Sequence, residues 1–512
     1  MRRIGALFVL VALVFGTATS VDAKTKKPRP SATTTTTTTT WPPLPASSTE
    51  VSWSACGNGF ECGTLSVPVD WRAPLGEQLP LALIRRPAED PSLRIGALLV
   101  NYGGPGQGGV SYLPRTWTRL PAGIRARFDI VSWDPRGTGD SRPIDCVDDA
   151  FLDEIMNLPA VPNSPEGLAA VHAFSNTFAQ GCAARMGAYA SYVGTRNTAR
   201  DLEAIRRALA EPTLNYLGYS YGTVVGAVYA QMFPTSIRTM VLDGPADWWQ
   251  PRLEYSYAQA QGFKQALDAF FGWCEAAVSC ALRQAGAPRA VLDALIVNTA
   301  AEVMPGSYSL NGAVRDGVLT GTTLETGVIN LLYDSRSWPT LANALRSAAQ
   351  DGWGGPLLAS ADQYYRRSVD GTFSSMVEAN AVIGCVDHPE TAPPTVVQEL
   401  ADVSRFQAQI PPWGGNWAVA GCRGMPRPAK GAKLGDLRVT NAPPILVVAT
   451  TGDPATPYSG ALTFVARLGS STLLTFEGTE HTAYGSARST CVDDIVDTYL
   501  VDRAVPAPDT RC

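Results

Sequence analysis

The residues of this chain that could do chemistry begin with Ser220, the central serine of the pentapeptide Gly218–Gly222, Gly-Tyr-Ser-Tyr-Gly. The short apolar stretch 214–217 precedes it, and the longer apolar stretch 223–233 follows it up to Pro234. A strand, a sharp glycine turn and a helix in this order form a nucleophile elbow, which exposes the serine hydroxyl above a sheet. The helix N-terminus then lies beneath any anion formed at that point. The pattern predicts that Ser220 is the nucleophile of an acyl-transfer reaction.

A serine nucleophile needs a base within hydrogen-bond reach, and the chain has only three histidines. His172 lies in a stretch with helical spacing, and His388 lies in a long region without regular alternation of elements. His481 follows the last predicted strand, 471–476, at the edge where the loops of a parallel sheet converge. We therefore predict that His481 is the base.

The base needs a carboxylate that fixes its tautomer, and two aspartates compete for this role. Asp453 follows the predicted strand 444–449, which gives the order Ser, Asp, His expected for elbow-type hydrolases. Asp243 ends the strand after the elbow helix, where some such enzymes place the acid, although it could instead bond only its own turn. Asp453 is the prediction, and Asp243 is the alternative.

Two backbone N–H groups must stabilise the charge that develops on the substrate carbonyl oxygen. Tyr221, directly after the nucleophile, supplies one of them. The loop 103–106, Gly-Gly-Pro-Gly, follows a predicted strand and is the source of the second. We predict Gly104 for this role, because Pro105 has no N–H group.

The same glycine loop also matches a different motif. Residues 104–109 fit Gly-x-Gly-x-x-Gly after a strand, with Asp129 further along the chain, which is typical of dinucleotide binding. Asp129 begins the next strand rather than ending it, and an exported protein rich in cysteine rarely meets NAD. We therefore expect no cofactor. We also expect no metal, because the chain has no His-Glu-x-x-His motif and the short cysteine pairs lack zinc spacing.

These residues must be positioned by a sheet and its helices. Continuous apolar strands that alternate with helices predict an α/β fold, with a mostly parallel sheet covered by helices on both faces. An antiparallel hairpin over 53–90 is expected to precede this alternation. The predicted strands are 96–100, 128–133, 214–217, 237–243, 444–449 and 471–476, and the predicted helices are 167–186, 196–210, 223–233 and 459–468.

The chain divides into five predicted regions. Residues 1–23 have the charged start, apolar run and small residues of a signal peptide. A linker rich in Thr and Pro, 24–50, follows, and its composition cannot build a core. The catalytic core is expected over 51–246 and 441–512. Between them, 247–440 lacks the regular alternation and is expected to be an inserted cap with a mainly helical structure.

The composition limits the partners and the compartment. A net charge of −5 gives no basic surface for nucleic acid, and the apolar run of the signal is too short to keep the mature protein in a membrane. Ten cysteines fit an oxidising compartment. We therefore expect a secreted protein that is either free or associated with the cell wall. Their pairing is open, but Cys56 with Cys62, Cys274 with Cys280, and Cys491 with Cys512 are close enough in sequence to bridge.

Taken together, these motifs resemble a known family. The Gly-Gly-Pro-Gly loop, the segment Trp133–Ser141, the elbow, Val241–Gly244 and the loop Gly452–Pro457 are similar to those of the secreted tripeptidyl aminopeptidase-like and proline iminopeptidase-like serine hydrolases of the α/β-hydrolase fold. The resemblance covers about 53–512. It implies an inserted cap, a triad of Ser, Asp and His at the positions predicted above, and cleavage near the free N-terminus of peptides.

One position departs from the family pattern. Proline iminopeptidases usually carry His-Gly-Gly-Pro-Gly, whereas Tyr102 stands in place of that histidine here. The glycines of the oxyanion loop are intact, but the departure argues against a specific proline iminopeptidase assignment.

An aminopeptidase also needs a carboxylate for the α-ammonium group of its substrate. Glu378, Asp387 and Glu390, in the C-terminal part of the insertion, are the candidates. The partner is then a peptide with a free N-terminus. Two alternatives stay open: the same triad could hydrolyse an ester, lipid or thioester, or the chain could be an envelope-binding protein that keeps only the shell of a hydrolase.

Overall fold

The computed structural model describes residues 50–512 except 156–157, 159–160, 391, 413–415 and 420. The predicted signal peptide and almost all of the predicted linker lie outside the described residues. Within them, ten strands form one sheet in the order β1-β2-β3-β5-β4-β6-β7-β10-β11-β12. These strands are β1 (Ser54–Gly57), β2 (Phe60–Pro68), β3 (Gln78–Arg86), β4 (Gly96–Asn101), β5 (Phe128–Trp133), β6 (Leu214–Tyr219), β7 (Ile237–Asp243), β10 (Ile445–Thr450), β11 (Ser471–Phe476) and β12 (Thr510–Arg511).

The sheet combines an antiparallel edge with a parallel centre. β1, β2 and β3 pair antiparallel, and β3 joins the rest by pairing antiparallel with β5. Every pair from β5 through β4, β6, β7, β10 and β11 to β12 is parallel. The central strands β4 and β10 are buried at all positions, which explains their uninterrupted apolar sequences. The predicted hairpin and the predicted parallel sheet are both confirmed.

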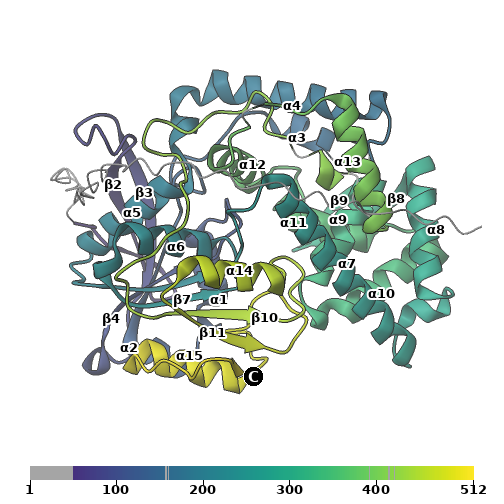
Figure 1. Cartoon of the computed structure of the whole chain (residues 1–512). Coiled ribbons are helices and arrows are strands. Elements are labelled where there is room, and N and C mark those ends of the chain that lie inside the picture. The colour runs from purple at the N-terminus through teal and green to yellow at the C-terminus, as the bar shows by residue number, and fades with distance from the viewer. Residues whose placement is uncertain (1–49, 156–157, 159–160, 391, 413–415, 420) are drawn as a thin grey trace, which may run out of the picture. The chain divides into compact units, whose positions relative to one another are not determined.

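Helices cover both faces of this sheet, as Figure 1 shows. On one face, α2 and α15 contribute Ile124, Val492 and Val496 to a core shared with Val100 and Leu446 of the strands. On the other face, α6 packs against β6 and β7, with α5 beside it. The helices of the core are α1 (Gly109–Thr116), α2 (Ala122–Arg127), α3 (Asp149–Ile155), α4 (Pro165–Arg185), α5 (Thr195–Ala208), α6 (Gly222–Met232), α14 (Tyr458–Leu468) and α15 (Thr490–Asp502).

A long insertion separates two strands that are neighbours in the sheet. The chain leaves the sheet at the end of β7 and returns with β10, which pairs with β7. The insertion has an apolar core, to which Phe263, Phe270, Leu341 and Phe406 contribute and which Leu168 of α4 joins from outside the insertion. Its elements are α7 (Arg252–Ala276), α8 (Pro288–Ala301), α9 (Gly321–Leu332), α10 (Trp338–Arg346), α11 (Gly355–Tyr365), α12 (Met376–Asp387), α13 (Val396–Gln409) and the antiparallel hairpin of β8 (Met304–Leu310) and β9 (Ala313–Leu319).

The cysteines form five disulfides. The three pairs suggested by sequence proximity, Cys56–Cys62, Cys274–Cys280 and Cys491–Cys512, are all present. The other two join segments 36 and 37 residues apart, Cys146–Cys182 and Cys385–Cys422. No helix among the described residues is both long enough and apolar enough to span a bilayer.

Candidate active site

The backbone at Ser220 has the geometry of a nucleophile elbow. Ser220 lies between β6 and α6 with a φ of 55°, a left-handed conformation that costs a non-glycine residue free energy. A Cβ atom on Gly218 would lie 2.5 Å from the Gly222 carbonyl oxygen, and one on Gly222 would lie 2.7 Å from the Asn101 carbonyl oxygen. Only glycine fits at both positions, which explains the spacing of the pentapeptide. The Ser220 N–H donates to the Asp243 carbonyl at 2.9 Å and ties the elbow to the next strand.

His481 and Asp453 form a hydrogen-bonded pair. The His481 Nδ1 atom lies 2.9 Å from both carboxylate oxygens of Asp453. Burial lowers the pKa of His481, but the charge of Asp453 and its hydrogen bond outweigh burial and raise this pKa above its usual 6.5. Both side chains are almost completely buried, so their attraction acts in a region with little water.

The loop after β10 fixes the Asp453 carboxylate. Its Oδ1 atom accepts hydrogen bonds from the backbone N–H groups of Ala455 and Thr456, at 2.9 and 2.8 Å. Its Oδ2 atom accepts the Thr456 hydroxyl at 2.9 Å, and that hydroxyl also lies 3.4 Å from His481 Nδ1. Thr456 was not among the residues predicted from the sequence. Its position three residues after an aspartate, in a turn, is the signal that points to such a bond.

Asp243, the alternative acid, has different partners. Its carboxylate accepts the backbone N–H groups of Ala483 and Tyr484, at distances between 2.8 and 3.1 Å. Burial raises the pKa of Asp243 to about 7. Asp243 therefore holds the loop that carries His481, whereas the side-chain partner of His481 is Asp453.

The glycine loop after β4 lies directly against the elbow. A Cβ atom on Gly103 would lie 2.9 Å from the Tyr221 nitrogen and 3.0 Å from the Ser220 Cβ. The Gly103 N–H donates to the Asn101 side chain at 2.9 Å, so it is already used. The N–H groups of Gly104 and Tyr221 donate no hydrogen bond to any described residue. The N–H groups of Gly104 and Tyr221 are thus both available to bind an anion, as the predicted oxyanion hole requires.

A cavity of about 300 Å³ opens beside Ser220. Ser220 and His481 both line it, together with the charged residues Arg119 and Asp334. Asp334 is paired with the guanidinium groups of Arg336 and Arg488. The other lining residues include five tyrosines, Tyr102, Tyr112, Tyr219, Tyr333 and Tyr484. This cavity has room for a few residues of a peptide chain or an ester of similar size.

Two of the three carboxylates predicted to bind substrate already have partners within the protein. The Glu378 Oε1 atom accepts the backbone N–H groups of Cys146 and Val147, at 2.7 and 3.1 Å. Asp387 accepts the Thr195 N–H and the Trp248 indole N–H, at 2.9 and 3.0 Å. Burial raises the pKa of Glu378 to about 7 and that of Asp387 to about 6.

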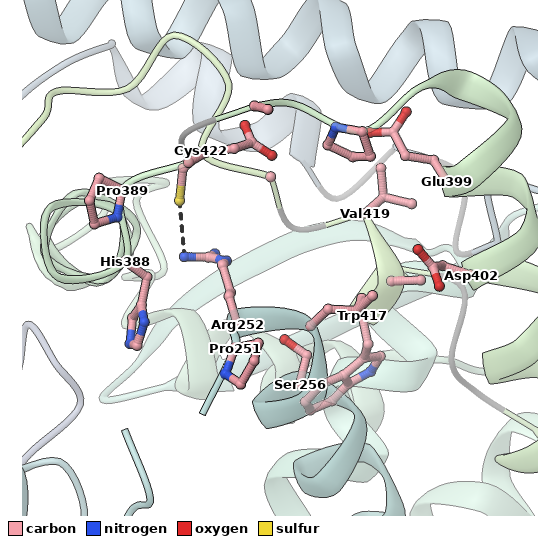
Figure 2. A pocket seen from close by; sticks show the side chains of 16 residues that line it. Pro251, Arg252, Ser256, His388, Pro389, Glu399, Asp402, Trp417, Val419 and Cys422 are labelled. Carbon is pink, nitrogen blue, oxygen red and sulfur yellow. Dashed lines mark hydrogen bonds between the residues drawn. The ribbon is translucent and has the colours of Figure 1, made fainter. Parts of the chain in front are cut away.

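The third carboxylate, Glu390, lines a second cavity of about 420 Å³, shown in Figure 2. Arg252 projects into this cavity from α7, and its guanidinium group donates to Cys422 Sγ at 3.2 Å. Glu399 and Asp402 of α13 line the same cavity. The cavity thus presents three carboxylates, from Glu390, Glu399 and Asp402, and one guanidinium group.

The remaining histidines lie elsewhere. The His172 Nε2 atom lies 3.0 Å from a Glu399 oxygen. His388 packs edge-on against Trp248, and burial lowers its pKa to about 4. Asp129, the acidic residue of the dinucleotide motif, bonds Arg94 at 2.9 Å. Among residues 50–512, apart from the undescribed gaps, no three His, Cys, Asp or Glu side chains are grouped as metal ligands would be.

Comparisons with known proteins place the chain in a family. Residues 410–512 match the family model described as TAP-like protein. The chain is 35% identical to serine protease Hip1 of Mycobacterium tuberculosis, with 92% of this chain and 90% of that protein covered. It is 34% identical to carboxylesterase B of the same organism, covering 92% and 91%. It is 30% identical to the tripeptidyl aminopeptidase of Streptomyces lividans, covering 91% and 87%.

Among solved structures, a proline iminopeptidase of Mycobacterium smegmatis aligns over 86% of this chain and 98% of its own, with 16% identity and a TM-score of 0.33. The order of the strands in the sheet, the elbow at Ser220 and the relatives, which align with more than nine-tenths of the chain, all point to the same family. The chain belongs to the TAP-like family of serine hydrolases with the α/β-hydrolase fold.

Proposed function

We propose that this chain is a secreted aminopeptidase in which Ser220, His481 and Asp453 form the catalytic triad. The observation that supports this most is the placement of both Asp453 oxygens 2.9 Å from His481 Nδ1, while Ser220 and His481 line one cavity. A carboxylate at Nδ1 holds the proton on that nitrogen and leaves Nε2 free to act as a base.

In the first half of the reaction, Ser220 Oγ attacks the scissile carbonyl carbon and His481 Nε2 accepts the hydroxyl proton. The carbonyl oxygen becomes an oxyanion, which the N–H groups of Gly104 and Tyr221 bind. The C–N bond then breaks, and the His481 imidazolium gives its proton to the departing amine. Asp453 stabilises the imidazolium while it exists.

In the second half, water attacks the acyl-enzyme ester and His481 takes one of its protons. The new oxyanion is bound by the same two N–H groups. Collapse of this intermediate breaks the ester bond, Ser220 regains its proton from His481, and a free carboxylic acid leaves. The cycle consumes one water per peptide bond and needs no other reactant.

The proposal that the substrate is a peptide rests on the names of the relatives. Two of the family members compared above are named a serine protease and a tripeptidyl aminopeptidase. Glu390 is the remaining candidate for the substrate α-ammonium group, because it lines an open cavity, whereas the carboxylates of Glu378 and Asp387 bond the protein itself. That cavity shares no lining residue with the cavity beside Ser220, so the role requires a peptide that extends from one cavity to the other. An ion pair of this kind contributes about 1.5–3 kcal/mol to binding. Export is supported by the predicted signal peptide and by the five disulfides.

The second candidate function is ester hydrolysis, favoured by the relative named carboxylesterase B. A substrate panel separates the two. We expect tripeptide p-nitroanilides with a free amine to be cleaved faster than their N-acetylated forms, and faster than p-nitrophenyl esters. Equal rates for free and acetylated peptides would rule out the aminopeptidase, and a preference for esters would select the alternative.

The role of Glu390 can be tested with the same panel. Glu390→Gln should raise KM for free-amine peptides about 10- to 100-fold, since it removes the charge that pairs with the ammonium group. The N-acetylated peptide is the internal control, because its cleavage needs no such pair. An equal change for both substrates would show that Glu390 does not bind the ammonium group.

A further inference from the structure

One side of the elbow is connected to helix α12 of the insertion through a buried carboxylate. Asp387, at the end of α12, accepts the N–H and the hydroxyl of Thr195, the first residue of α5. It also accepts the indole N–H of Trp248 at 3.0 Å. The Thr195 hydroxyl in turn bonds the hydroxyl of Tyr221, the residue after the nucleophile. Asp387 therefore joins the insertion, the core and the elbow at one point.

The direction of these bonds is fixed by their protons. A hydroxyl has one proton, and that of Thr195 is donated to the acceptor-only carboxylate of Asp387. The Tyr221 hydroxyl must therefore donate to Thr195. Burial raises the pKa of the Tyr221 hydroxyl well above 10, so this proton stays in place at neutral pH. The Tyr221 ring is also packed edge-on against Trp248, with ring centroids 5.3 Å apart.

The same helix contacts the other side of the oxyanion hole. The Asn380 side-chain amide of α12 donates to the Pro105 carbonyl at 3.1 Å. A Cβ atom on Gly106 would lie 2.7 Å from the Met376 carbonyl oxygen, so this loop is in close contact with the first turn of α12. Gly104, the second predicted oxyanion donor, immediately precedes Pro105. One helix thus contacts the glycine loop directly and the Tyr221 segment through Thr195.

We propose that helix α12 sets the geometry of the oxyanion hole, with Asp387 positioning Tyr221 through Thr195 and Asn380 positioning the Gly104 loop through Pro105. The proposal rests on the proposed function, in which the N–H groups of Tyr221 and Gly104 bind the oxyanion. Asp387, Thr195 and Asn380 touch no reacting atom, so they are positioning residues. The insertion then takes part in catalysis and does more than cover the site.

This role has a kinetic signature. Oxyanion contacts strengthen only in the transition state, so displaced donors lower kcat and leave KM nearly unchanged. Complete loss of one donor costs about 100- to 1,000-fold in kcat. A displaced donor should cost less. We expect a loss of about 10- to 100-fold in kcat for Tyr221→Phe, Thr195→Val and Asp387→Asn, and a loss of about 3- to 10-fold for Asn380→Ala, whose bond is nearer to solvent.

The experiment measures kcat and KM of the purified, disulfide-bonded protein, with active sites counted by titration. A peptide aldehyde supplies a second readout, since it forms a tetrahedral adduct with an oxyanion and its affinity should fall in proportion to kcat. Thr195→Ser keeps both the hydroxyl and the N–H, and should restore activity to within about threefold of wild type.

A matched control is available in the insertion. Asp362 of α11 is also a buried carboxylate that accepts a tyrosine hydroxyl, that of Tyr308 at 2.9 Å, and it contacts neither the elbow nor the glycine loop. Asp362 also pairs with the guanidinium group of Arg315, so Asp362→Asn should lower the unfolding midpoint at least as much as Asp387→Asn. It should nevertheless leave kcat unchanged.

The outcomes separate this proposal from the proposed function. If the wild type cleaves peptides, and Asp387→Asn and Tyr221→Phe leave kcat as unchanged as the control Asp362→Asn does, the positioning role is wrong and the proposed function stands. If these variants change KM rather than kcat, α12 contributes to substrate binding and the proposal is again overturned. If the wild type shows no peptidase activity, the proposed function itself fails.

Discussion

Replacing Asp453 by asparagine tests the assignment of the triad with the smallest change in shape. The two backbone N–H groups of Ala455 and Thr456 donate to Oδ1, so the amide oxygen of Asn must take that place. The amide NH₂ group then takes the place of Oδ2, 2.9 Å from His481 Nδ1. Oδ1 also lies 2.9 Å from Nδ1, but it already accepts two backbone N–H groups. The amide N–H therefore competes for Nδ1, makes it an acceptor and moves the imidazole proton to Nε2. The base can then no longer accept the Ser220 proton.

The expected loss is about 10,000-fold in kcat, the size of effect seen when the acid of a serine triad becomes an amide. This corresponds to about 5.5 kcal/mol of transition-state stabilisation. The fold should survive, because both backbone N–H groups keep their acceptor. The assay is the cleavage of a free-amine tripeptide p-nitroanilide, with circular dichroism and the unfolding midpoint as controls for the fold.

Asp243→Asn is the matched comparison. Its carboxylate bonds the backbone of the loop after His481 rather than the imidazole, so its loss should be smaller, about 10- to 100-fold in kcat. Asp453 is not the acid of the triad if Asp453→Asn keeps activity within tenfold of wild type while Asp243→Asn loses most of it.

Three further predictions concern pH and the glycine loop. Because the pKa of His481 is raised above 6.5 and only the neutral imidazole accepts a proton, kcat/KM should fall as pH drops, with a midpoint above 6.5; a midpoint clearly below 6.5 would contradict the pairing with Asp453. Burial raises the pKa of Glu325 from 4.5 to about 7, so the folded state binds more protons than the unfolded state and stability should fall as pH rises through that range. Glu325→Gln keeps an acceptor for the Trp417 indole N–H, and its unfolding midpoint should depend less on pH between about 5 and 8; an unchanged dependence would argue against this titration. Gly103→Ala should reduce kcat at least about 100-fold, because its Cβ would lie 2.9 Å from the Tyr221 nitrogen and displace a donor; near-normal activity in this variant would mean that the loop does not border the oxyanion hole.

The sheet and the elbow could be predicted from sequence because their signals are local. Buried parallel strands such as Gly96–Asn101 need continuous apolar residues, and the steric limits at Gly218 and Gly222 allow only glycine. His481 could be predicted by elimination because the chain has only three histidines, and the order of residues along the chain favours Asp453 as its partner. The structure places these two side chains in hydrogen-bond contact.

The structure of the insertion was predicted less well, because its elements are stabilised by contacts with residues distant in sequence. The hairpin of β8 and β9 was not expected, since its strands are largely exposed and contain Pro and Gly. Asp387 was predicted as a candidate for binding the substrate α-ammonium group, but it bonds Thr195, which lies 192 residues earlier in the chain. No local pattern could reveal that contact. The same holds for Glu378, which accepts hydrogen bonds from the backbone N–H groups of Cys146 and Val147.

The central claim is that Ser220 becomes covalently acylated during turnover. The most direct test is mass spectrometry of the protein after reaction with a fluorophosphonate, followed by proteolysis to locate the label. We expect one added phosphonyl group per chain, on the peptide that contains Ser220, with complete loss of peptidase activity and no labelling of Ser220→Ala. A label on another residue, or full activity in Ser220→Ala, would contradict it.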